Sequence, residues 1–132
     1  MVIINGENAI LGRLSTYVAK KLMNNEVVHI VNADKIIITG DPNQIVKKYH
    51  ERRARGSPQH GPFFPKSTTG IVRRTIRGML PYKKAKGKKL SNLKIHEGIP
   101  KNLEKENMEK IEKDISSDYI TVKELAMRIG GK

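Results

Sequence analysis

Three short runs of apolar, mostly β-branched residues near the start of the chain constrain its fold most strongly. They are Val2–Asn5, Val27–Val31 and Ile36–Thr39. Because nearly every position in these runs is apolar, we expect strands that are covered on both faces, as in a parallel sheet. Between the first two runs, apolar residues recur at helical spacing, at Leu11, Leu14, Val18 and Leu22. This strand, helix, strand order predicts an α/β sheet with a right-handed crossover.

A third and a fourth strand are predicted from similar patterns. Asn32, Ala33 and Asp34 link the second run to the third, and such a link is too short for a parallel crossover. If these two strands are neighbours they must pair antiparallel, so the sheet is expected to be parallel or mixed. The fourth predicted strand is Leu93–His96, which a Gly-Pro turn region follows.

The stretch from Gly70 to Lys89 combines an amphipathic helix with a basic tail. One side of the predicted helix is apolar apart from one threonine, and consists of Ile71, Val72, Thr75, Ile76, Met79 and Leu80. Arg73, Arg74 and Arg77 fall on the opposite side. Pro81 cannot continue the helix, so the lysines that follow it are expected in an irregular segment. One side of this helix is thus predicted to enter a core and the other to meet anions.

Three further helices are predicted. Asp41 and Pro42 form a favourable start for a helix that ends in arginines, and residues 52–69 then form a basic extended loop rich in Pro and Gly. Residues 100–115 are predicted to form an acidic helix with few apolar residues and two Glu-Lys pairs at i,i+4 spacing. Thr121 and Glu124 form a capping box at the start of the last helix, which is expected to end at Gly130-Gly131.

The positive charge of the chain is concentrated in one segment. Residues 47–94 hold 15 Lys or Arg and one acid, a net charge of +14, whereas the other 84 residues carry −1. Such a segment repels itself unless a polyanion neutralises it, so we predict a nucleic-acid partner rather than a merely solvated surface. An anionic membrane fits less well, because the apolar side of the helix is needed inside and no apolar run could span a bilayer.

The sequence offers little for catalysis. The chain has no cysteine, which excludes disulfides and thiolate chemistry, and Arg13 stands where a phosphate-binding loop would need lysine. The four histidines lack the spacing of zinc enzymes, so packing or phosphate contact is the simpler role for each. His96 and Glu97 are the only acid-base pair of interest, and a strand end followed by a Gly-Pro turn is strongly favoured over a catalytic role for them. We therefore predict no cofactor, no metal and no enzymatic activity.

Folded RNA is favoured over DNA as the partner. No helix-turn-helix or zinc finger is visible, and a long Pro/Gly loop with an irregular lysine tail suits folded RNA better than a uniform groove. Phe63 and Phe64 in the loop are equally consistent with stacking on bases and with burial in the protein. Two other functions stay open at this point: an RNA-modifying or RNA-cleaving enzyme that uses His96 and Glu97, and a DNA-packaging or regulatory protein.

Four motifs, in order along the chain, closely resemble the L13 family of large-subunit ribosomal proteins. They are LGRLST at 11–16, VNADKIIITG at 31–40, GIVRRTIRGMLPYKKAKGKK at 70–89 and LKIHEGIP at 93–100, and the resemblance covers about residues 2–100. The chain lacks the N-terminal extension and the insert of bacterial members and the longer C-terminal part of eukaryotic members. The resemblance is therefore to the archaeal type.

The resemblance implies one three-layer α/β/α domain over 1–132, with a four-stranded parallel or mixed sheet, a lysine-rich segment at 82–92 and a C-terminal helical part at 100–132. It implies a cytoplasmic ribosomal protein that binds large-subunit (23S-type) rRNA, assists subunit assembly and adjoins neighbouring ribosomal proteins, without a small-molecule substrate. Together with the charge pattern, it predicts RNA contacts by Arg13, Lys35, Arg52, Arg53, Arg55, His60, Phe63, Phe64, Lys66, Arg73, Arg74, Arg77, Lys83, Lys84, Lys86, Lys88 and Lys89.

Overall fold

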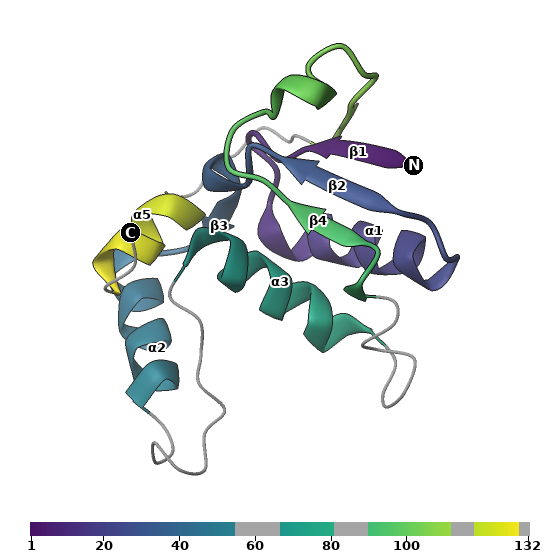
Figure 1. Cartoon of the computed structure of the whole chain (residues 1–132). Helices are drawn as coiled ribbons and strands as arrows, with labels where there is room; N and C mark the ends of the chain where they lie inside the picture. The colour runs from purple at the N-terminus through teal and green to yellow at the C-terminus, as the bar shows by residue number, and fades with distance from the viewer. Residues whose placement is uncertain (55–66, 81–89, 112–117, 130–132) are drawn as a thin grey trace.

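A four-stranded parallel sheet forms the centre of the protein (Figure 1). The structure is a computed structural model that describes residues 1–54, 67–80, 90–111 and 118–129, with the backbone alone at 52–54. The strand order is β4-β2-β1-β5, and the strands are β1 Val2–Asn5, β2 Val28–Val31, β4 Leu93–Ile95 and β5 Glu109–Lys110. All three neighbouring pairs are parallel, so the predicted α/β class and four-stranded sheet are confirmed.

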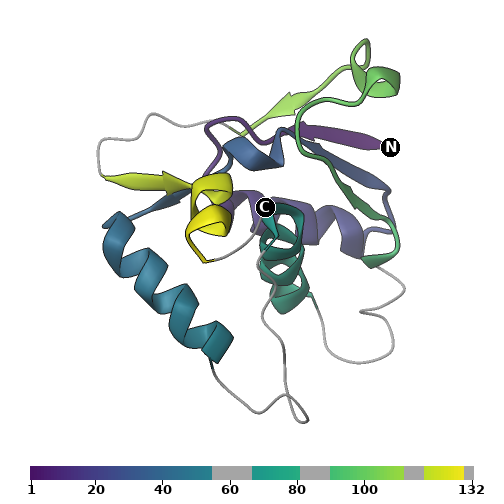
Figure 2. The ribbon, with the colours of Figure 1, turned by 60° about the vertical axis from the view of Figure 1, so that its left-hand side comes forward.

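Two helices cover one face of this sheet (Figures 1 and 2). They are α1, Leu11–Met23, and α3, Thr68–Met79, and they pack against each other. Leu14 and Leu22 of α1, Ile30 of β2 and Ile76 of α3 are all fully buried in the core between helices and sheet. Burying each such side chain contributes about 1.5–3 kcal/mol, so this layer supplies most of the stability that positions α3.

The opposite face is covered, among the described residues, by a short 3-10 helix, η2 Lys101–Leu103. Leu103 and Met108 pack there on Ile3 and Val31 of the sheet. The predicted helix over 100–115 is therefore wrong, because the chain forms η2 and then β5, while 112–117 lie outside the described residues. Each of the two Glu-Lys pairs would stabilise a helix by only about 0.2–0.5 kcal/mol, whereas burial of a leucine such as Leu103 contributes about 1.5–3 kcal/mol.

The third predicted strand leaves the sheet instead of pairing with the second. After β2 the chain turns through a 3-10 helix, η1 Ala33–Lys35, and enters β3, Ile37–Thr39. β3 pairs antiparallel with β6, Tyr119–Thr121, in a separate two-stranded ribbon. The second and third strands are thus not neighbours, and β5 takes the remaining place in the sheet beside β1.

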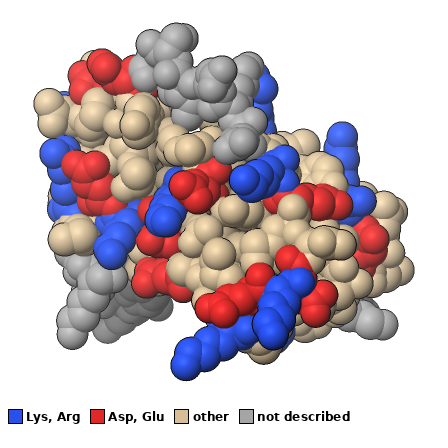
Figure 3. Space-filling view, turned by 90° about the horizontal axis from the view of Figure 1, so that it is seen from above, with Lys and Arg blue, Asp and Glu red and all other residues tan. Residues whose placement is uncertain are grey.

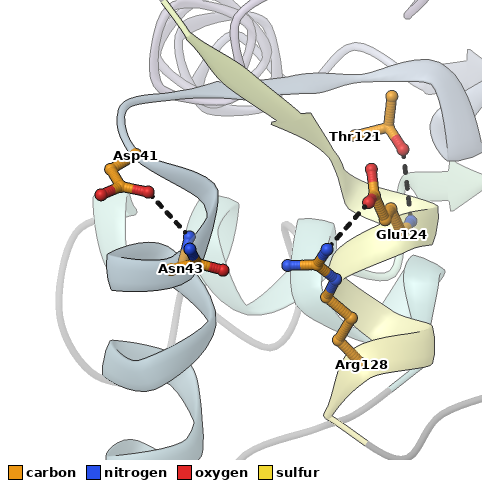
Figure 4. A network of polar contacts seen from close by, with 5 residues as sticks. All are labelled: Asp41, Asn43, Thr121, Glu124 and Arg128. Carbon is orange, nitrogen blue, oxygen red and sulfur yellow. Dashed lines mark hydrogen bonds and ion pairs between the residues drawn. The ribbon is translucent and has the colours of Figure 1, made fainter.

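Each strand of this ribbon is followed by a helix, and Figure 4 shows the caps of these two helices. They are α2, Pro42–Ala54, and α5, Val122–Arg128. Asp41 Oδ1 accepts a hydrogen bond from Asn43 N–H at 3.0 Å, and Thr121 Oγ1 accepts one from Glu124 N–H at 3.2 Å. Glu124 also forms a 3.5 Å ion pair with Arg128. Both predicted helix starts are confirmed, whereas Gly130-Gly131 lie outside the described residues.

Candidate nucleic-acid interface

The helix α3 begins at Thr68, two residues before the predicted start at Gly70, and ends at Met79, before Pro81. Because α2 also continues to Ala54, residues 52–54 and 68–69 are helical and the predicted loop over 52–69 is too long at both ends. Ser67 is the N-cap, and its Oγ accepts a hydrogen bond from Gly70 N–H at 3.1 Å. Leu80 has extended dihedrals (φ −84°, ψ 150°), as expected of a residue that precedes a proline. These two ends fix the length of α3, and burial of its apolar side chains fixes which side faces the core.

The apolar side of α3 is buried largely as predicted. Ile71, Val72 and Ile76 are fully buried, and Leu80 just beyond the helix is 5% exposed. Met79 is the exception, because 42% of it is exposed, so its assignment to the buried side is wrong. It is the last residue of α3, and its sulfur lies 3.5 Å from Thr16 Oγ1 on an exposed part of α1.

The arginines of α3 lie on its other side. Arg73 and Arg77 are exposed, while Arg74 is half-buried and has an interaction partner. Arg73 Nη1 donates to Leu93 O of β4 at 3.4 Å, a long and therefore weak hydrogen bond. The guanidinium of Arg73 thus lies at the outer edge of the sheet, and this bond uses one of its five N–H donors.

The other predicted contact residues are described only in part. Arg13 on α1 and Lys35 at the end of η1 are exposed, and both elements pack against α3. Arg52 and Arg53 lie in the last turn of α2, where only the backbone is described. Ten predicted residues lie outside the described ranges: Arg55, His60, Phe63, Phe64, Lys66, Lys83, Lys84, Lys86, Lys88 and Lys89.

The sheet face opposite α1 and α3 has a different electrostatic character. Acidic and basic side chains alternate over it in Figure 3. The ion pairs Lys21–Glu26, at 3.8 Å, and Glu124–Arg128 involve residues outside the basic segment 47–94. Basic side chains thus pair with acidic side chains of the same chain in the part of the sequence whose net charge is close to zero.

Two histidines stack on that face. His29 of β2 and His96 after β4 have ring centroids 5.4 Å apart, and His29 Nδ1 lies 3.1 Å from His96 Nε2. Burial, and then the neighbouring His96 and Lys94, lower the pKa of His29. Glu97 is exposed, and the described residues contain no group of three or more His, Cys, Asp or Glu side chains placed to hold a metal ion. These two rings therefore pack against each other on the face of the sheet opposite α1 and α3.

A model of the family "Ribosomal protein L13" matches residues 1–102. The chain belongs to the ribosomal protein L13 family. This confirms the resemblance drawn from the four motifs. The family is one of ribosomal proteins and not of enzymes, which agrees with the prediction that the chain is not an enzyme.

Similar L13 proteins extend the likeness over the whole chain. The large ribosomal subunit protein uL13 of Thermoplasma volcanium is 45% identical over 136 residues, 99% of each chain. Those of Methanocaldococcus jannaschii and Methanosarcina barkeri are 44% and 42% identical, and each match covers 100% of this chain and 99% of the relative. These relatives are archaeal, as predicted, and the matches include residues 103–132, beyond the family model.

Sequence reasoning on this L13 chain left out two residues that lie beside Arg73. Lys94 and His96 line the same groove as Arg73, between α3 and β4. The alternation in Leu93–His96 was a usable signal, because it places Lys94 and His96 together on one face of a strand. What the sequence could not supply was that β4 lies at the edge of the sheet next to α3.

None of the helices in the described ranges has the length and apolar character needed to cross a membrane.

Proposed function

We propose that the chain is a structural constituent of the large subunit of the cytoplasmic ribosome. In this proposal it binds large-subunit rRNA through the basic segment 47–94, assists folding of that rRNA during assembly, and adjoins neighbouring ribosomal proteins. Family membership supports the coarser part, since the relatives are named large ribosomal subunit proteins.

One observation carries the rRNA-binding part of the proposal. α3 buries Ile71, Val72 and Ile76 and leaves Arg73 and Arg77 exposed, within a segment of net charge +14. Exposed arginines on a rigid helix are suited to bidentate contacts with phosphates, because their guanidinium groups are planar forks. On the face drawn in Figure 3, the described acidic and basic side chains are intermingled, so that face offers a polyanion no comparable site.

The salt dependence of affinity tests this proposal. The affinity of the full chain for a transcript of archaeal 23S-type rRNA is measured at several KCl concentrations, and the slope of log K against log[KCl] counts the neutralised phosphates. Replacing Arg73, Arg74 and Arg77 together by Ala is expected to reduce the slope by about 0.7–0.9 for each phosphate that the variant no longer neutralises.

A matched variant removes the same charge elsewhere. The triple substitution of Lys20, Lys101 and Lys123 by Ala removes three exposed lysines outside 47–94 and is expected to leave the slope unchanged. Equal slopes for both triple variants would contradict the assignment of this face. Equal affinity of the wild-type chain for duplex DNA and for rRNA at matched salt would instead favour the DNA-binding alternative.

A further inference from the structure

A groove of about 250 Å³ separates the first turns of α3 from β4. β4 is an edge strand of the sheet, so one side of its backbone has no neighbouring strand among the described residues. Edge strands of this kind are open to further hydrogen bonding, and proteins often guard them with charged side chains. Here the groove runs along that open side, below which α3 lies in Figure 1.

The backbone of β4 directs a donor into this groove. Pairing with β2 uses alternate residues, since Val28 N–H donates to Asn92 O at 2.9 Å and His96 N–H donates to Ile30 O at 2.8 Å. The peptide groups of Leu93 and Ile95 must therefore point away from β2. Leu93 O accepts from Arg73, as described above, so the outward groups of the two residues are the N–H donors of Leu93 and Ile95 and the acceptor Ile95 O.

Positive side chains flank the groove from two directions. Leu93 is buried on the side of α1 and α3, and Ile95 packs against the same core, so Lys94 and His96 lie on the opposite face of the sheet. Arg73 approaches from α3, on the core side. None of the described residues that line the groove is acidic. An anion in the groove would thus contact Arg73 from one side and Lys94 from the other.

We infer that this groove binds the sugar-phosphate backbone of RNA, with one phosphate held between Arg73 and Lys94. The inference rests on the proposed rRNA-binding function and deepens it by adding Lys94 and the edge of β4 to the interface. The Arg73 fork offers several N–H donors in a plane, Lys94 offers a point charge and Ile95 N–H a neutral donor, which together suit a tetrahedral anion. The apolar side chain of Ile95 also lines the groove and can lie against a ribose.

A carboxylate from a neighbouring protein is the other anion of suitable size. RNA is favoured because the groove is continuous with the basic side of α3, where Arg77 is exposed four residues from Arg73. A segment of charge +14 requires a polyanion, and a single carboxylate neutralises one charge only.

Two single substitutions test the groove. Lys94→Ala is expected to reduce the salt slope for the 23S-type rRNA transcript by about 0.7–0.9, the amount that corresponds to one phosphate. Lys123→Ala is the control, since Lys123 is an exposed lysine on α5 outside the groove. Far-UV circular dichroism and urea unfolding check that both variants fold as the wild type does.

The absence of cysteine from the chain allows a second, geometric test. Thr69 lines the groove, so a Thr69→Cys variant carrying an iron-EDTA group is expected to cleave the bound rRNA backbone nearby. Glu104, exposed beside η2, is the control, and the same probe on Glu104→Cys should cleave the rRNA less.

The outcomes separate this inference from the proposed function. Equal slopes for Lys94→Ala and Lys123→Ala, with wild-type rRNA binding intact, would overturn the groove assignment alone. So would cross-linking of the Thr69→Cys variant to a protein, without rRNA cleavage, in assembled subunits, because the groove would then hold a protein carboxylate. A wild-type chain that fails to bind the rRNA at low salt would overturn the proposed function together with the inference.

Discussion

Asn32 holds the turn through which the chain leaves β2, and its replacement tests how that turn is stabilised. The residue is 5% exposed and has left-handed dihedrals, φ 54° and ψ 38°. Its side-chain Nδ2–H donates to Asn5 Oδ1 at 3.0 Å, and its backbone N–H donates to Gly98 O at 2.9 Å. Asparagine tolerates this backbone conformation better than other residues that carry a side chain.

Two losses add up in an Asn32→Ala variant. Placing alanine in the left-handed region costs about 1 kcal/mol, and loss of the buried hydrogen bond costs about 1 kcal/mol. The acceptor Asn5 Oδ1 also receives Glu7 N–H at 3.0 Å, so it is not left unsatisfied and adds no further penalty. We therefore expect the free energy of unfolding to fall by about 2 kcal/mol.

Asn32→Gly separates the two contributions. Glycine loses the same hydrogen bond but adopts positive φ without strain, so this variant should be about 1 kcal/mol more stable than Asn32→Ala, less any entropy cost of glycine. Urea unfolding at 25 °C, followed by far-UV circular dichroism with unchanged m values, measures both. Equal stability of the two variants would refute the role given to the left-handed backbone.

A double-mutant cycle isolates the hydrogen bond itself. Asn5→Ala, Asn32→Ala and the double variant are compared with the wild type, and the coupling free energy is expected to be about 1 kcal/mol. Because Asn5 and Asn32 are in direct contact, additivity is not expected. A coupling near zero would mean that the hydrogen bond contributes nothing to stability.

Three further predictions concern the core and the face of the sheet opposite α1 and α3. In Gly6→Ala the new Cβ would lie 2.7 Å from Cγ1 of the buried Ile36, so urea unfolding should show a loss of about 1–3 kcal/mol in the free energy of unfolding. Gly12→Ala is the control, because nothing lies within 4 Å of its new Cβ, and it should be neutral or stabilising. Similar losses in the two variants would contradict this packing. Ile76→Ala empties a fully buried site on α3 and should cost about 2–5 kcal/mol, and a loss below 1 kcal/mol would contradict the packing described. Burial, and then nearby positive charge, lower the pKa of His29 on folding, so the folded state binds fewer protons than the unfolded state. The free energy of unfolding should therefore fall as the pH drops below about 6.5 toward the folded pKa. His29→Gln should flatten this part of the stability profile, and an unchanged profile would count against the prediction.

The first half of the fold could be predicted because its signals are local. β1, α1 and β2 follow from runs that are apolar at every position and from a helical period between them. The starts of α2 and α5 follow from capping residues, whose hydrogen bonds join groups two or three positions apart. In each case the residues that decide the structure are close in sequence.

The errors arise where a distant partner decides. Residues 100–115 carry charges at i,i+4 spacing, yet Leu103 and Met108 pack on Ile3 and Val31, on the face of the sheet opposite α1 and α3. The run Ile37–Thr39 has the same pattern as the sheet strands, but its partner is β6, Tyr119–Thr121. The pattern of apolar residues predicts that a segment forms a strand, but it does not predict which other strand pairs with it.

The same limit explains the candidate interface. Helical periodicity alone predicted that the apolar residues and the arginines of α3 lie on different sides of the helix. The placement of Lys94 beside Arg73 depends on β4 being the edge strand nearest α3, which is a property of the strand order. Site residues on one element were predictable, whereas a site shared between two elements needed the topology.

Because α3 supplies both core and charge, packing defects and charge defects should affect RNA binding differently. Removing a buried side chain such as Ile76 costs about 2–5 kcal/mol, but a domain stable by about 5–15 kcal/mol then stays mostly folded. Affinity falls only with the folded fraction, so it should change little until stability is nearly exhausted. Removing Arg77, which is exposed, should leave stability almost unchanged and lower affinity directly. The two roles of α3 lie on opposite sides of one helix, and they are therefore separable by single substitutions.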